Sequence, residues 1–220
     1  MGNFDPTRLR PLPREFFDRD PRKVARDLLG KVLVRRERGR LLAARVVETE
    51  AYLGTEDPAA HAFAGPTERN RVLFGPPGHA YVYFIYGNHH CLNVSCEPEG
   101  MAGCVLFRAL EPLQGESAMA KARGLAAPEP AAVQARPGLL RHLTSGPGRL
   151  AEAFGITRPR DNGKDLTSAE NDLFLADDGA GKMKIESSAR VGITKAAERR
   201  LRFYVEGNAF VSGKRVESSK

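Results

Sequence analysis

Two acidic side chains, Glu48 and Glu50, stand two positions apart in a segment that predicts a β-strand over residues 41–52. Side chains alternate along a regular strand, so Val46, Glu48, Glu50 and Tyr52 are expected to share one face. If Val46 and Tyr52 pack inward, one acid is partly desolvated, and its raised pKa suits a general base. The alternative is a solvated face on which both acids pair with nearby arginines, and the pattern alone does not decide between the two.

Flat side chains gather close to these acids. Residues 52–90 hold four of the five tyrosines and four of the five histidines: Tyr52, Tyr81, Tyr83, Tyr86, His61, His79, His89 and His90. Such rings beside a carboxylate favour a pocket that holds a flat or cationic ligand by stacking. Rings in a strand are more often core or cross-strand pairs, and their number alone favours that interpretation. Their position between two acids and a basic run favours the pocket.

The balance of charge points to a nucleic-acid partner. The formal net charge is +7, which favours nucleic acid over an anionic membrane or an acidic protein, although an ordinary basic protein can carry the same charge. Exposed N–H groups at a helix that begins at Gly146 would also favour an anion. Further cations that could reach phosphates are scattered along the chain: Arg69, Arg71, Arg108, Arg141, Arg149 and those of residues 195–202.

Cysteine spacing and hydropathy indicate an intracellular protein. Cys91, Cys96 and Cys104 form no CxxC pair, so they are expected to be reduced and buried. No apolar run approaches the roughly 20 residues of a membrane span, and the first residues do not resemble a signal peptide. We therefore expect a cytoplasmic protein without a membrane partner.

Metal and cofactor chemistry find little support in the sequence. His89 and His90 are adjacent, so on a regular element their side chains point apart. Asp57 stands four residues before His61, which would suit a metal on a helix, but a loop and ring stacking explain the spacing equally well. The sequence also contains no P-loop, no GxGxxG and no GxSxG motif. No metal and no cofactor are expected.

Strands and helices that must position these residues are interspersed along the chain. One helix is predicted from Pro21, with Asp20 as its N-cap, to Gly30, and another from Pro147 to Gly155. Strands are expected over residues 31–36, 41–52, 81–86, 91–96, 103–110, 173–176, 183–186 and 202–205. They predict a single α+β domain over residues 1–220, with a mixed, largely antiparallel curved sheet flanked by helices.

Two segments are expected to lie outside the core. Residues 1–19 are polar and rich in proline, and they are predicted to wrap the surface as an arm. Residues 115–138 begin with a short helical pattern and continue as an Ala/Pro-rich stretch, which predicts a mobile loop.

At the chemistry-bearing residues the chain resembles the alkyladenine (3-methyladenine) DNA glycosylase family, as a compact member of the bacterial type. The matching blocks follow the order of the family from about residue 28 to residue 212: VETEAYLG at 47–54, AH at 60–61, RNR at 69–71, YVYFIYG at 81–87, Asn93, VLFRALEP at 105–112, SGP at 145–147, ARVG at 189–192 and LRFYV at 201–205. Residues 115–138 carry no motif of the family.

The resemblance implies a chemical role for four of these residues. Glu50 is implied to activate the water that attacks C1′ of a damaged nucleotide, and Arg108 to help hold that water. The backbone near Val191 and Ile193 is implied to complete the contacts to water and base. Since no lysine nucleophile is indicated, we expect a monofunctional glycosylase that leaves an abasic site in an intact strand.

The resemblance also implies how the damaged base is held. Tyr52, His61 and Tyr83 are implied to sandwich the flipped base, and Asn93 to exclude the 2-amino group of guanine. Tyr86 is implied to enter the vacated position in the DNA stack, which would offset part of the cost of flipping. The remaining expected partners are the phosphates of double-stranded DNA, contacted by Arg69, Gly146, Arg149 and Arg190.

The resemblance thus predicts a monomeric glycosylase associated with the nucleoid. Two other classes of function are the alternatives. A catalytically silent nucleic-acid-binding module would keep the basic residues, but it has no need of Glu50 and Arg108 beside a water site. A metal-dependent nuclease would require an acidic metal cluster, which the sequence does not contain.

Overall fold

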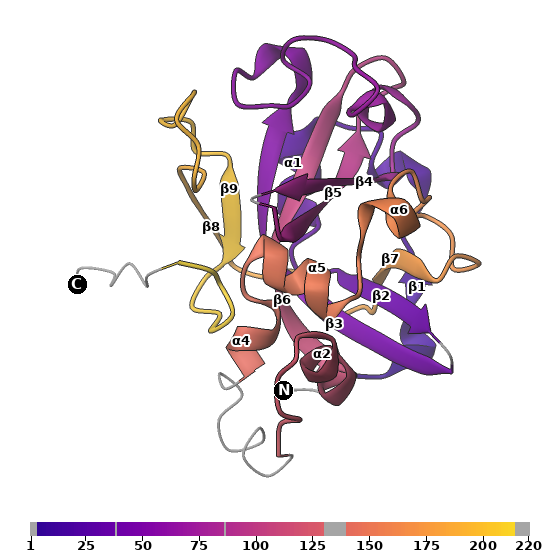
Figure 1. The fold of residues 1–220 in the computed structure, drawn as a ribbon. Helices are drawn as coiled ribbons and strands as arrows, with labels where there is room; N and C mark the ends of the chain where they lie inside the picture. The colour runs from indigo at the N-terminus through magenta and orange to yellow at the C-terminus, as the bar shows by residue number, and fades with distance from the viewer. Residues whose placement is uncertain (1–3, 38, 86, 130–139, 214–220) are drawn as a thin grey trace, which may run out of the picture.

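The centre of the molecule is a nine-stranded sheet of the path β1-β7-β2-β3-β6-β5-β4, with β9 pairing β3 and β8. The computed structural model describes residues 4–37, 39–85, 87–129 and 140–213 (Figure 1). Within these residues every strand pair is antiparallel, and the sheet is open rather than closed into a barrel. The α+β class and the largely antiparallel sheet are thereby confirmed.

The elements have the following bounds. The strands are β1 (Arg10–Pro11), β2 (Val32–Glu37), β3 (Arg40–Leu53), β4 (Ala80–Ile85), β5 (His89–Cys96), β6 (Gly103–Gln114), β7 (Leu173–Asp177), β8 (Ile185–Ser188) and β9 (Arg202–Val205). The helices are α1 (Pro21–Asp27), α2 (Glu116–Ala122), α4 (Arg141–Thr144), α5 (Pro147–Ala153) and α6 (Arg158–Asp161), with 3₁₀ turns η1 (Pro6–Arg8), η2 (Arg14–Phe16), η3 (Gly54–Glu56) and η4 (Arg71–Phe74).

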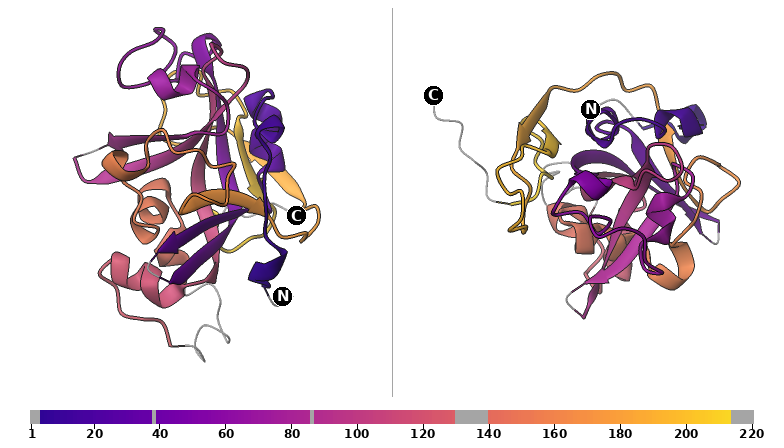
Figure 2. Two further views of the ribbon diagram at one scale, coloured as in Figure 1. Left: turned by 90° about the vertical axis from the view of Figure 1, so that its right-hand side faces the viewer. Right: turned by 90° about the horizontal axis from the view of Figure 1, so that it is seen from above.

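Strand β3 is the longest and has neighbours along most of its length. Its first half pairs with β2, three residues of its second half, 48–50, pair with β9, and β6 runs along its other edge. Helix α1 packs on one face of this part of the sheet, whereas α5 packs on β5 and β6. Figure 2 shows α1 and the helices of residues 141–161 on opposite sides of the strands. The second half of β3 is therefore enclosed from several directions.

The pairing of β3 with β6 shifts register at three positions, one of them between Ala43 and Ala44 at the start of β3 and the other two close to Glu48. Val47 has no partner between the pairs Val46–Leu110 and Glu48–Ala109, and Arg108 has none before the pair Thr49–Phe107. The two irregularities near Glu48 offset each other, so the pairs from Ala44 to Val46 and those from Thr49 to Leu53 keep one register. A bulge re-aims the side chain it carries. The expectation that Val46 shares a face with Glu48, Glu50 and Tyr52 assumed a regular strand, and that condition is not met at Val47.

The other predicted elements are found with small shifts at their ends. Asp20 caps α1 by accepting a hydrogen bond from the Arg22 N–H, and Pro21 is the first helical residue. Pro147 likewise starts α5. The three cysteines are free and buried, as expected. Among the described residues, no helix combines the length and the apolar character needed to cross a membrane.

The expected mobile loop of residues 115–138 begins with a packed helix. Met119 and Ala120 of α2 are fully buried in the main core, as the short helical pattern indicates. Residues 123–129 follow without regular structure, and residues 130–138 lie outside the described part of the chain.

The N-terminal segment is part of the fold, so the prediction of a surface arm is wrong for its second half. Arg10 and Pro11 pair with β7 at the edge of the sheet, and the Leu12 N–H donates to the Leu175 carbonyl at 2.9 Å. Leu12 and Phe17 are buried in the main core. Two isolated apolar residues in a proline-rich stretch show no periodicity, which is why the pattern did not reveal them.

This packing predicts a large effect of the substitution Phe17→Ala. Because the ring is fully buried, its removal is expected to lower the free energy of unfolding by about 3–5 kcal/mol. Urea denaturation measures it, with Phe63→Ala, at a ring that is 47% exposed, as the control that should change stability far less. Equal, small effects of both substitutions would contradict the placement of the N-terminal segment.

Candidate active site

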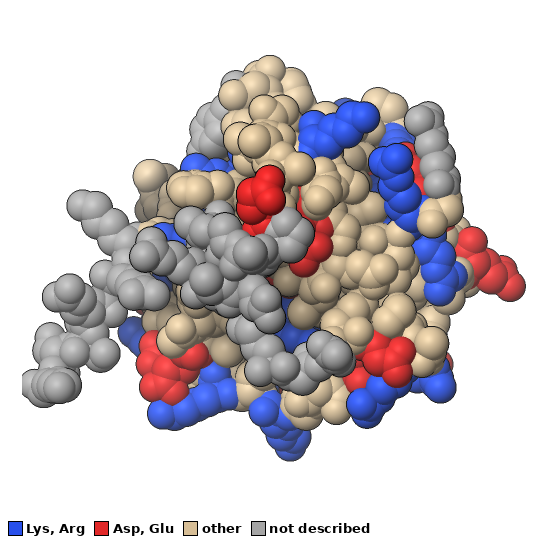
Figure 3. All heavy atoms as spheres, turned by 90° about the horizontal axis from the view of Figure 1, so that it is seen from below, with Lys and Arg blue, Asp and Glu red and all other residues tan. Residues whose placement is uncertain are grey.

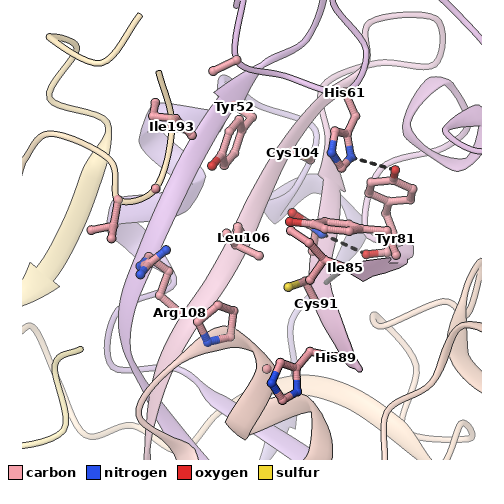
Figure 4. Close-up of a pocket in the computed structure, with 17 residues that line it drawn as sticks. Tyr52, His61, Tyr81, Ile85, His89, Cys91, Cys104, Leu106, Arg108 and Ile193 are labelled. Atoms are coloured by element: carbon pink, nitrogen blue, oxygen red, sulfur yellow. Dashed lines mark hydrogen bonds between the residues drawn. The ribbon is translucent and has the colours of Figure 1, made fainter. Parts of the chain in front are cut away.

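A cavity of about 360 Å³ opens where the second half of β3, the middle of β5 and β6, and the end of β4 meet. Seven of the predicted site residues line it: Tyr52, His61, Tyr83, Asn93, Arg108, Val191 and Ile193. Figure 4 shows Tyr52 and Arg108 on one side of the cavity and His61 and Tyr81 on the other. Strand register produces this convergence, since Asn93 pairs with both Tyr81 and Leu106. Residues far apart in the sequence thus meet as the motifs implied.

Glu50 is fully buried directly behind this lining. One carboxylate oxygen, Oε1, accepts a hydrogen bond of 2.8 Å from the Val191 N–H and lies 3.4 Å from an Nη of Arg108. The other, Oε2, accepts a hydrogen bond of 3.0 Å from the Tyr52 hydroxyl. All three neighbours line the cavity, so the carboxylate is fixed at its wall.

The electrostatics of the Glu50 carboxyl combine opposing influences. Burial raises its pKa, whereas the Arg108 cation, the Val191 N–H and the Tyr52 hydroxyl lower it, and the net shift is upward. Burial and the neighbouring Glu50 in turn raise the pKa of Tyr52, so this hydroxyl stays protonated and donates. Such a carboxylate can accept a proton more readily than an exposed one.

Aromatic rings form the opposite wall. The His61 ring meets the Tyr83 ring edge to face, with centroids 4.6 Å apart, and its Nδ1 lies 2.9 Å from the Tyr81 hydroxyl. Burial and the nearby Arg69 cation lower the pKa of His61, so the ring is neutral at pH 7. Asn93 is buried and its Nδ2 donates to the Tyr81 carbonyl at 3.1 Å. This wall can stack a flat group, and its neutral imidazole adds no charge that would repel a positive one.

Comparison with known proteins decides the family. The family described as methylpurine-DNA glycosylase matches residues 15–209. The chain belongs to this family. It is therefore a DNA glycosylase, a hydrolase of DNA repair. The resemblance first seen in short motifs extends over nearly the whole chain.

Several relatives of this glycosylase align over most of both chains. A protein of Koribacter versatilis is 59% identical over 207 residues, which cover 94% of this chain and 95% of the relative. One of Anaeromyxobacter sp. is 48% identical over 91% of this chain and 92% of its own. One of Methanocella arvoryzae is 45% identical over 91% and 95%. Each carries the name "Putative 3-methyladenine DNA glycosylase".

Glu48, the second acid of the glycosylase motif, is also fully buried and is bound by two arginines. It accepts hydrogen bonds from Nε of Arg108 at 3.0 Å and Nε of Arg202 at 2.7 Å. The N–H and hydroxyl of Ser212 donate to it as well, at 2.6 and 2.9 Å. Glu48 thus holds the Nε edge of Arg108, while an Nη of the same guanidinium faces Glu50. The strand pattern predicted that the two acids share a face but gave no sign of Arg202 or Ser212.

Two of the residues expected to contact DNA phosphates bind partners within the protein instead. Arg190 is wholly buried and forms an ion pair with Asp57, so it cannot reach the DNA backbone, and the prediction for it is wrong. The N–H of Gly146 donates to the Arg108 carbonyl at 2.9 Å, which leaves it no hydrogen for an anion. The charge of Arg190 and the position of Gly146 at a helix start do not reveal these partners, because Asp57 and Arg108 lie far away in the sequence.

The remaining predicted site residues are placed as follows. Arg69 is exposed, with its guanidinium carbon 5.7 Å from the Tyr83 ring centre, and Arg149 is exposed on the first turn of α5. Tyr86 lies outside the described residues. The cavity is also lined by residues to which the sequence assigned no role in the site: Tyr81, Ile85, His89, Cys91, Cys104 and Leu106. Within the described ranges, no group of three or more His, Cys, Asp or Glu side chains is placed to hold a metal ion.

The raised pKa of Glu50 predicts that Glu50→Gln stabilises the protein at neutral and alkaline pH. An acid whose folded-state pKa exceeds its unfolded value destabilises the fold above the folded pKa and not below the unfolded one. The free energy of unfolding of Glu50→Gln should therefore exceed that of the wild type at pH 8 by more than roughly 0.5 kcal/mol, the scatter of surface substitutions. Towards pH 4 the difference should vanish.

Urea denaturation at a series of pH values measures this difference. Glu170→Gln, the same change at an exposed position, is the control and should unfold like the wild type throughout. A Glu50→Gln protein that is less stable than the wild type at pH 8 would show that the carboxylate is favourably ionised in the fold.

Proposed function

We propose that this glycosylase flips a damaged purine out of duplex DNA and hydrolyses its N-glycosidic bond with a water activated by Glu50. The observation that carries the proposal is the buried Glu50 carboxylate, fixed by three donors at the wall of a ring-lined cavity. The product is an abasic site in an intact strand, as in base excision repair.

The geometry of Glu50 supports the role of a general base. Its two oxygens are oriented by the Val191 N–H and the Tyr52 hydroxyl, and lone pairs remain to accept a proton from water. The water oxygen forms a bond to C1′ as the bond from C1′ to the purine nitrogen breaks, and the water proton passes to Glu50. Arg108, which faces both the cavity and Glu50, is suited to hold that water.

The substrate class follows from the opposite wall and from the relatives. An alkylated purine is cationic, so it stacks well on tyrosine rings and leaves as a neutral base. Tyr52, Tyr83 and the neutral His61 are the rings proposed to hold it, with Asn93 excluding the 2-amino group of guanine. The names of the relatives support 3-methyladenine as a substrate. Deaminated purines such as hypoxanthine are proposed as further substrates.

DNA must bring the base to this cavity, because a base inside a duplex is out of reach and flipping it costs a few kcal/mol. Arg69 and Arg149, exposed close to cavity-lining residues, are proposed to contact phosphates. The face seen in Figure 3 carries Lys and Arg interspersed with Asp and Glu, so its visible part offers no single-sign patch for DNA. Tyr86 is proposed, from the family resemblance alone, to fill the vacancy in the stack. The enzyme is proposed to act as a cytoplasmic monomer.

The test is excision from duplex oligonucleotides with one 3-methyladenine or hypoxanthine, in excess EDTA, followed by alkali. Strand breaks that appear only after alkali are expected, because a monofunctional enzyme leaves the backbone intact. Glu50→Gln should reduce single-turnover excision by at least about 100-fold, the contribution of a general base, while lesion DNA still binds. Glu170→Gln should excise like the wild type.

Three results would contradict the proposal. Breaks without alkali would indicate a lyase or nuclease, and loss of activity in EDTA would indicate a metal. Full turnover by Glu50→Gln would refute the role of this carboxylate as the base.

A further inference from the structure

Arg190, which was expected to contact a phosphate, instead forms an ion pair with Asp57 that is buried beside the active site. Both side chains are fully inaccessible to solvent, and the guanidinium donates to both carboxylate oxygens, with Nη2 to Oδ1 at 2.9 Å. Such a bidentate pair has a fixed geometry. Although burial by itself raises the pKa of Asp57, hydrogen bonds from Arg190 and from backbone N–H groups bring it below the ordinary value, so the carboxyl is ionised.

The pair joins three separate segments that surround the cavity. Asp57 accepts hydrogen bonds from the N–H groups of Leu53 and Ala59, each at 3.2 Å. Arg190 donates to the Ala51 carbonyl at 3.0 Å. The end of β3, the turn that leads to His61 and the segment around residue 190 are thus tied at one point.

Arg190 also contacts the groups that fix Glu50. Its guanidinium carbon lies 4.6 Å from the centre of the Tyr52 ring, and the hydroxyl of that tyrosine donates to Glu50. The next residue is Val191, whose N–H donates to Glu50 at 2.8 Å. Both neutral donors to the carboxylate are therefore adjacent to this one arginine.

Apart from Arg190, the segment that carries Val191 is held mainly at its end, where Leu201 is buried and its carbonyl accepts the Ala51 N–H at 2.8 Å. Residues 189–201 form neither helix nor strand, and Arg190 is the one buried residue between positions 178 and 200. An exposed irregular segment is ordinarily mobile unless side chains tie it down. Its placement against Glu50 depends on the arginine that enters the interior.

We propose that the buried pair of Asp57 and Arg190 is a positioning pair, which holds the Val191 N–H and the Tyr52 hydroxyl on the Glu50 carboxylate. Neither residue touches the substrate; they act on the reaction through Glu50. The inference rests on the proposed function, because it assumes that Glu50 is the base. The alternative is that the pair contributes only to stability.

The test must separate the placement of the donors to Glu50 from the effect that the charges of Asp57 and Arg190 have on its pKa. Charged or titratable groups that face Glu50 are Arg108 on β6, Tyr52 and Glu48 on β3, and Arg190. Removing Asp57 alone would leave an unpaired cation that lowers the pKa of Glu50, against the effect of losing a donor. The double variant Asp57→Asn/Arg190→Gln removes both charges together, and it also avoids the large destabilisation of a single buried charge. Arg190→Lys keeps the charge and loses the bidentate fork.

The measurement is the pH dependence of single-turnover excision on a hypoxanthine duplex. Loss of a hydrogen bond to the ionised carboxylate raises its pKa, so the acidic limb should move up by about one pH unit in both variants. The maximal rate should fall, by up to about 100-fold for a displacement near 1 Å. Asp161→Asn disrupts an equally buried pair with Arg35, neither residue of which lines the cavity, so it should lose stability and keep the wild-type pH profile.

Two results would overturn the positioning role. One is an acidic limb that stays in place in both variants while stability falls, as in Asp161→Asn. The other is wild-type excision by the double variant. Failure of the proposed function would look different, because Glu50→Gln would then retain the acidic limb of the wild type.

Discussion

Two carboxylates that must be buried side by side, those of Glu48 and Glu50, set the constraints on this end of the sheet. Burying a charge costs several kcal/mol unless it is paired and hydrogen-bonded, and two like charges aggravate the cost. The arginines Arg108 and Arg202 balance the two acids, and Ser212 satisfies the remaining acceptors of Glu48. Glu50 receives weaker compensation, which leaves its pKa raised. Glu48 thus has hydrogen-bond donors for both of its oxygens, whereas Glu50 remains available to accept a proton.

The local backbone explains how one arginine serves both acids. Arg108 is the unpaired residue of a bulge in β6, opposite the bulge at Val47 in β3. Like Cys104 and Leu106, Arg108 lines the cavity, so alternation along β6 already directs its side chain inward, where the guanidinium reaches both carboxylates. Its carbonyl also receives the N–H of Gly146, so the start of α5 is fastened to the same point.

How much of the structure can be predicted from the sequence depends on how far apart along the chain the interacting residues lie. Alternation and turn residues act locally, so the strands around Glu50 and Tyr83 and the cap at Asp20 were predictable. That the motif residues lie together was implied by the family resemblance and not by these local patterns. The pairing of Arg190 with Asp57 spans 133 positions, and an arginine in a sequence looks the same whether it meets a phosphate or a buried carboxylate. The burial of Phe17 depends in the same way on elements far along the chain, so neither feature leaves a local signal.

The proposed mechanism requires that the Glu50 carboxyl have a raised pKa and that its ionised form drive excision. The most direct measurement is the carboxyl ¹³C shift of Glu50 against pH, assigned by its absence in Glu50→Gln and compared with single-turnover rates. We expect a midpoint above the ordinary value of about 4.3 for glutamate, coincident with the acidic limb of excision. A midpoint at the ordinary value, or an acidic limb that titrates elsewhere, would contradict it.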